Sequence, residues 1–211
     1  MEDSLRIAEP VALARPRGAH RYEAFSPKLS RRLTLYTRPA LEQWILLEAN
    51  PAVVTFCERP GFVQLDGQRC LADFWADYVD RQELVLLTDS PIDGEMTDAA
   101  RELDGKALAI RRVASAELVA ARAWVDNWRC MLPCLIANRK LVLPSLSRPI
   151  ELFLDKPKRL ADVEREFSAG DPVLVRAALF GLLHQGKVCA PELRTQSLSL
   201  LTSFAATEAI S

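Results

Sequence analysis

The sequence has 211 residues, of which 49% are hydrophobic, so it can form one large domain or two small ones with a buried core. A formal net charge of −1 excludes a polycation that binds nucleic acid through total charge alone. We find no signal-peptide pattern and no apolar run that would span a bilayer, and we therefore expect a soluble, cytoplasmic protein without a membrane partner. Five cysteines without a CxxC pair favour a reduced chain without a zinc site.

The first forty residues are more basic than the rest of the chain. Eight Arg or Lys side chains stand against four acids, a balance of 8 − 4 = +4, and Tyr22, Phe25 and Tyr36 lie among them. Prolines and Gly18 predict an irregular arm over residues 1–30. A basic arm with aromatic residues can follow a phosphate backbone, although a solvated tail has the same composition. The side chains expected to contact DNA here are Arg15, Arg17, Lys28, Arg31 and Arg32.

The next region predicts one helix and a succession of strands. Leu41, Trp44 and Ile45 share a face of a helix over 40–49, and Thr37 can cap it. β-Branched residues, alternation and the Asp66-Gly67 turn predict strands around it, at 31–36, 52–57, 62–65, 70–79 and 83–87. The last of these strands is continuously apolar, as expected in the middle of a sheet that is covered on both faces.

A crossover and a long helix complete the first domain. We expect a helix over 96–103 to lead to a strand over 106–113, parallel to the strand at 83–87. Ser115 begins a long amphipathic helix, and Pro133 bends or ends it. The prediction is an α/β domain with a mixed sheet flanked by helices over 31–137.

The C-terminal quarter differs in composition. Prolines and basic residues predict a linker with one helix (160–167) over 138–170, and Lys156, Lys158 and Arg159 in it are further candidates for DNA contact. Pro172 at the first helical position and Gly186 after the last turn frame a helix over 173–185. A Leu-, Ser- and Thr-rich ribbon follows, so 171–211 has the parts of a winged helix, although the ribbon could be a third helix.

Two acids stand out in the central region. Glu42 lies on the predicted helix, and Asp73 lies between Leu71 and Phe74 in an apolar strand. A helix acid and a strand acid at the edge of a three-stranded sheet hold a divalent metal in many nucleases. Glu42 can equally be a surface acid, but a buried Asp73 without a partner would be costly.

Several segments carry a resemblance to one family, and they are 41–47, 50–60 (NPAVVTFCERP), 72–74 (ADF), 125–128 (VDNW) and 179–188 (LFGLLHQGKV). The sequence resembles the TnsA family, transposon endonucleases that cut the 5′ ends of an element beside a DDE-type transposase. The resemblance implies a restriction-endonuclease-like core followed by a small winged-helix domain.

The same resemblance implies site residues. Glu42 and Asp73 would be the catalytic acids and the first two metal ligands. The family's third strand provides a Glu and a Lys two residues apart, whereas residues 87–90 here read Leu-Thr-Asp-Ser. The backbone of Thr88 and the displaced carboxylate of Asp89 are the remaining candidate ligands. Loss of one such charge-stabilising group typically lowers the rate about 10²–10³-fold.

We therefore expect an accessory subunit of a heteromeric DNA transposition complex, with weak or no nuclease activity. By resemblance, its partners would be transposon-end DNA, a DDE-type transposase and an AAA+ ATPase regulator. One alternative is an active endonuclease that cleaves transposon 5′ ends with Mg²⁺, and its third metal ligand would then be displaced to Asp89 or Glu83. A chain without nuclease activity would need no cofactor. Another alternative is a winged-helix DNA-binding regulator.

Overall fold

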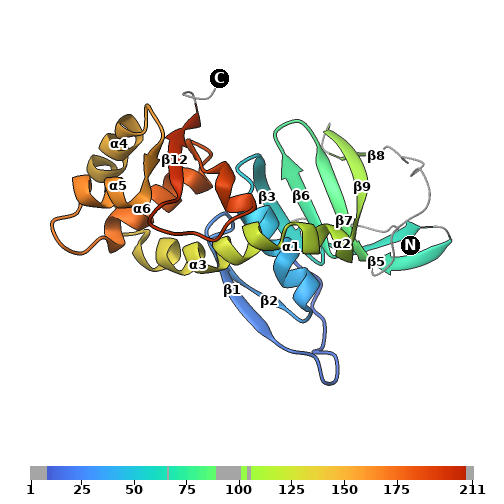
Figure 1. Cartoon of the computed structure of the whole chain (residues 1–211). Coiled ribbons are helices and arrows are strands. Elements are labelled where there is room, and N and C mark those ends of the chain that lie inside the picture. Colours follow the sequence, from blue (N-terminus) through green and yellow to red (C-terminus); the bar gives the residue numbers. More distant parts are fainter. Residues whose placement is uncertain (1–8, 66, 89–100, 104–105, 208–211) are drawn as a thin grey trace. The chain divides into compact units, whose positions relative to one another are not determined.

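A computed structural model describes residues 9–65, 67–88, 101–103 and 106–207. The chain forms two compact units. Unit 1 consists of Met1–Glu48 and Ala52–Ala120, and unit 2 consists of Ala49–Pro51 and Ala121–Ser211. The predicted α/β class, with a mixed sheet flanked by helices, is confirmed (Figure 1).

The described residues of unit 1 form a five-stranded mixed sheet, two hairpins and two helices. The sheet has the order β3-β6-β7-β9-β8, and the hairpins are β1-β2 and β4-β5. The strands are β1 (Tyr22–Ser26), β2 (Arg31–Leu35), β3 (Val53–Glu58), β4 (Phe62–Leu65), β5 (Gln68–Leu71), β6 (Phe74–Tyr78), β7 (Gln82–Thr88), β8 (Arg101–Leu103) and β9 (Lys106–Ala114). The helices are α1 (Arg38–Glu48) and α2 (Ser115–Ala120).

The strand β7 lies in the middle of this sheet. It pairs antiparallel with β6 and, as the sequence predicted, parallel with β9. On one face Trp75 and Leu84 pack beneath Val63 of the β4-β5 hairpin. Phe56, Phe74 and Val85, which lie at alternate positions and face the other side, are buried as well, and α1 packs against β3. Burial on both faces explains why β7 reads as a continuous apolar run.

Several predicted boundaries in unit 1 are wrong. Residues 22–26, predicted to be irregular, form β1, because they pair with β2 in a hairpin. The strand predicted over 70–79 is divided into β5 and β6, because the chain bends at Asp73 between them. Arg101–Leu103 is a strand and not part of a helix, and residues 96–100 of the predicted crossover lie outside the described part of the chain.

The long helix predicted from Ser115 is two helices. The first, α2, ends at Ala120, and α3 (Arg122–Asn138) begins after Ala121, which has non-helical backbone angles. Pro133 does not end α3, which continues for five more residues. The division between the two units falls at the same point as the break in the helix.

Unit 2 combines helices with a small antiparallel sheet of order β10-β12-β11. Its remaining elements are α4 (Pro144–Phe153), β10 (Lys158–Arg159), α5 (Leu160–Phe167), α6 (Val173–His184), β11 (Val188–Cys189), the short 3-10 helix η1 (Pro191–Arg194) and β12 (Ser203–Ala206). The predicted helix 160–167 is present as α5. The rest of 138–170, predicted as a linker, also contains a helix and a strand. Pro144 begins α4, where a missing backbone N–H costs no hydrogen bond, and β10 pairs with β12.

The helix α6 lies at the centre of unit 2 and packs against α3, α4 and α5. Seven of its side chains are buried, among them Leu179 and Phe180. In the described residues, no helix has both the length and the apolar character needed to cross a membrane.

Candidate functional site

Asp73 lies at a bend immediately before β6, and not within the strand as predicted. Its backbone bridges two neighbours, because its N–H donates to Val85 O at 3.0 Å and its carbonyl accepts from Arg59 N at 2.8 Å. Its side-chain Oδ2 accepts a hydrogen bond from the Leu87 N–H at 2.8 Å. Burial raises the pKa of Asp73, and the Leu87 N–H acts in the opposite direction. The fold thus holds a largely buried carboxylate against the end of β7.

Glu42 lies on α1 and pairs with Arg38 one helical turn earlier, at 2.7 Å. Its side chain is 19% exposed, whereas that of Arg38 is 59% exposed. An i,i+4 pair of this kind contributes about 0.3–0.5 kcal/mol to stability. The carboxylate therefore has a local partner on its own helix, as expected of the surface-acid alternative.

The third-strand candidates have different surroundings. Thr88 is the last residue of β7, and its carbonyl accepts from the Ser115 hydroxyl at 3.5 Å. Asp89 lies outside the described residues.

Glu83, the alternative ligand, lies nearer the other end of β7 and pairs with Ala76 of β6. Ala76 is three residues along the chain from Asp73, about 10 Å at the rise of a strand. Glu83 bonds to Arg81 at 2.8 Å and forms a longer ion pair with Arg111 at 3.8 Å. Burial, together with Glu83, raises the pKa of Tyr78 to about 12. The carboxylate of Glu83 is therefore used in a cluster of charged side chains away from Asp73.

In the described residues, these positions do not make up a complete set of Mg²⁺ ligands. Magnesium needs near-octahedral oxygen ligands, usually carboxylates and water. Glu42 is engaged with Arg38, and Asp73 with the Leu87 N–H. Within the described part of the chain, no group of three His, Cys, Asp or Glu residues could hold a metal ion.

Two of the basic residues predicted to bind DNA are used inside the fold. Arg31 forms two hydrogen bonds to the buried Glu58 carboxylate, at 2.8 and 2.6 Å. The ammonium of Lys28 donates to Val53 O at 2.6 Å. Burial lowers the pKa of Lys28, and nearby Glu48 opposes that effect. Both cationic groups are therefore bonded to atoms of unit 1.

The other predicted DNA contacts are more accessible. Arg15, Arg17 and Arg32 are exposed in unit 1, and Lys156 and Arg159 are exposed in unit 2. The Lys158 ammonium lies over the Phe153 ring, 5.1 Å from its centroid. These residues belong to two units, and each unit therefore holds its own group of basic side chains.

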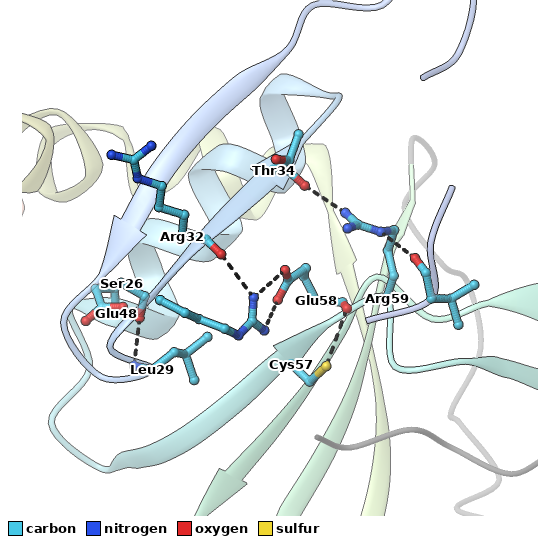
Figure 2. A network of polar contacts seen from close by, with 10 residues as sticks. Ser26, Leu29, Arg32, Thr34, Glu48, Cys57, Glu58 and Arg59 are labelled. Atoms are coloured by element: carbon cyan, nitrogen blue, oxygen red, sulfur yellow. Dashed lines mark hydrogen bonds and ion pairs between the residues drawn. The ribbon is translucent and has the colours of Figure 1, made fainter. Parts of the chain in front are cut away.

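The sequence did not single out a polar network at the end of β3 (Figure 2). Glu58, the last residue of β3, is 1% exposed and is paired with Arg31. The next residue, Arg59, bonds through its side chain to the carbonyls of Val11 and Thr34 (Figure 2). The sequence signal for this network was the charged pair Glu58-Arg59 between an apolar strand and Pro60. The partners of Arg59 could not be predicted, because they lie 25 and 48 residues away in the sequence.

Asn127 on α3 was quoted only within the VDNW segment, yet it is 4% exposed and fully bonded. Its amide group donates to Leu193 O at 2.8 Å and to Gln196 O at 2.7 Å. Its side-chain oxygen accepts from the Leu198 N–H at 2.8 Å. This one side chain fixes η1 and the segment that follows it onto α3.

Comparison of the sequence with protein-family models finds no match. Comparison with curated proteins likewise finds no significant relative.

Proposed function

We propose that this chain is a TnsA-like accessory subunit of a heteromeric DNA transposition complex, with weak or no nuclease activity. The supporting observation is the hydrogen bond between Asp73 and the Leu87 N–H. It brings the candidate acid of the second long strand next to the position where the TnsA-like pattern has a third-strand acid. Leu87 and Thr88 are the two candidates for that position, and neither carries a carboxylate, which supports weak or no cleavage.

The chemistry of metal-dependent cleavage explains the expected loss of activity. Phosphodiester hydrolysis needs several acidic oxygens to hold the metal and a basic group to stabilise charge. The described residues supply Asp73 at this point, bonded to a backbone N–H, while Glu42 is paired with Arg38. A TnsA-like chain without these ligands would be suited to binding DNA rather than cutting it.

Unit 2 supports a role in docking. Its order of helix, strand, two helices and two strands (α4, β10, α5, α6, β11, β12) supports the proposed winged helix. In a DNA-reading winged helix, the N-terminal residues of the last helix reach base edges. Here the exposed N-terminal residues of α6 are Val173 and Leu174, and Arg176 is paired with Glu164. Apolar side chains there favour a protein partner, a transposase or AAA+ regulator by resemblance, over the alternative of a DNA-binding regulator.

The test uses the purified chain and labelled duplex DNA from the ends of the element that encodes it, with Mg²⁺ or Mn²⁺. We expect salt-dependent binding without nicking, and a stable complex with the transposase or the ATPase encoded beside it. The matched variants are Asp73→Ala and, as a control, Asp80→Ala, which changes an exposed turn aspartate.

Two results would contradict the proposal. Nicking that is abolished in Asp73→Ala but kept in Asp80→Ala would identify an active endonuclease. Failure to bind both the element ends and the neighbouring transposition proteins would remove the accessory role.

A further inference from the structure

Arg59 joins the N-terminal arm to the rest of unit 1. The Val11 N–H donates to Arg59 O at 2.9 Å, and the Arg59 Nε donates back to Val11 O at 3.2 Å. The same guanidinium donates to Thr34 O of β2 at 2.8 Å. Both polar backbone atoms of Val11 are therefore bonded to one residue.

Arg59 has an uncommon backbone conformation, with φ +49°, in the left-handed region. Residues with a side chain seldom adopt it, and they keep it where surrounding contacts require it. This conformation lets the Arg59 N–H reach Asp73 O at 2.8 Å while its carbonyl receives the Val11 N–H. The arm is therefore anchored to the residue that also holds the backbone of the candidate acid.

The arm beyond this anchor is folded into a turn. Arg15 donates twice to Ala19 O, at 2.9 and 2.6 Å, and the Ala19 N–H bonds to Pro16 O at 3.1 Å. The exposed Arg17 lies inside this turn, six residues from Val11 and so within about 20 Å of the anchor. A turn closed by its own hydrogen bonds presents Arg17 with little conformational freedom left to lose on binding.

We propose that Arg59 is a positioning residue, which clamps the arm at Val11 so that Arg17 contacts a phosphate of duplex DNA lying beside Asp73. The DNA contact rests on the proposed function above. The clamp itself rests on the contacts of Val11, Thr34 and Asp73 alone, and it can be tested without DNA.

The first experiment measures amide hydrogen exchange of the full-length protein. Arg59→Asn removes the guanidinium, while asparagine tolerates the left-handed conformation better than most residues. We expect exchange at Val11 to become at least tenfold faster, since a charge-assisted hydrogen bond is lost. Arg165→Asn, which removes an exposed arginine paired with Asp162, controls for net charge and should leave Val11 unchanged. Unchanged exchange at Val11 in Arg59→Asn would overturn the clamp.

If Arg59→Asn does not fold, Val11→Pro tests the same contact from the arm. It removes the N–H that donates to Arg59 O and leaves the strands of the sheet intact. Faster exchange across the arm supports the clamp, and unchanged exchange overturns it.

The second experiment measures affinity for the same duplex in Arg17→Asn, Arg59→Asn and the double variant. We expect each single change to weaken DNA binding about 3- to 10-fold. Arg17→Asn should also reduce, by about one, the magnitude of the slope of log binding constant against log salt concentration. If Arg59 acts through the arm, the DNA affinity of the double variant equals that of whichever single variant binds DNA less tightly. Additive effects would overturn the positioning role. Absence of DNA binding by the wild type would overturn the DNA contact, and the exchange result would still decide the clamp.

Discussion

At the scale of single residues, the acids of unit 1 that are partly or fully buried differ in their partners. Glu58 is matched by the guanidinium of Arg31 with two hydrogen bonds. Glu48, which is fully buried, accepts from the Ser26 hydroxyl and the Lys28 N–H. Asp73 receives the neutral N–H of Leu87, and its pKa is raised by burial. A buried charge that meets a neutral donor costs more than one that meets a cation.

This difference predicts the effect of pH on Asp73→Asn. Because the folded protein raises the pKa of Asp73 above its ordinary 3.8, the stabilising effect of the protonated form is complete below pH 3.8. That stabilisation is lost as the pH rises through the raised value. We therefore expect Asp73→Asn to be more stable than the wild type at pH 7 and equal to it below pH 3.8, as measured by urea unfolding across this range.

Asp80→Asn provides the control, because Asp80 is exposed in the turn after β6. It should change the free energy of unfolding by no more than about 0.5 kcal/mol. A loss of stability in Asp73→Asn that is the same at every pH would contradict the assignment of the burial cost to the charge.

At the scale of elements, α6 and the turn that ends it hold unit 2 together. Gly186 has φ +74°, and the N–H groups of Gly186 and Lys187 bond back to Leu183 O and Leu182 O. A Cβ at Gly186 would lie 2.7 Å from the Pro51 Cβ. The glycine is therefore required both by the backbone conformation and by a close neighbour.

Two alanine substitutions in this region should have opposite signs. Gly186→Ala should destabilise the protein by about 1–3 kcal/mol, since it combines a left-handed backbone with overpacking. Gly181→Ala should stabilise it by about 0.5–1 kcal/mol, because a Cβ there meets nothing within 4 Å and alanine favours the helix. Thermal unfolding of both variants checks the pair. Equal effects of the two changes would show that the cap has no special role.

The elements also show which information is local in the sequence. Helices α5 and α6 were predictable because periodicity, Pro172 and Gly186 mark them within a few residues. The break at Ala121 was not, since alanine gives no signal for ending a helix. Asp73 could be found as an acid in an apolar run, but its partner Leu87 is 14 residues away and donates through the backbone, which no side-chain pattern reveals.

At the scale of the whole molecule, the chain has two compact units, and Asn127 belongs to unit 2. Its three hydrogen bonds hold Leu193, Gln196 and Leu198 against α3. Truncating such a side chain leaves buried backbone groups without partners, at a cost of about 1–3 kcal/mol. The cost should be confined to the unit that contains them.

Hydrogen exchange of Asn127→Ala tests this separation. We expect exchange to become faster at 193–198 and in β12, while β6 and β7 of unit 1 keep the wild-type rates. Asn138→Ala is the matched control, since Asn138 makes one such bond, to Cys134 O of its own helix at 2.8 Å. Faster exchange in β6 and β7 as well would show that the two units open as one.

The assignment of Ala49–Pro51 to unit 2 has a practical consequence for dissecting the protein. A cut after Ala120 separates most of each unit but removes Pro51 from beside Gly186. A fragment that begins at Ala121 would thus start with a gap in its own packing, and one that begins at 150 would also lose α3 and half of α4. Binding studies of the C-terminal half are best made by inactivating unit 1 within the full chain, where the short 49–51 segment stays in place.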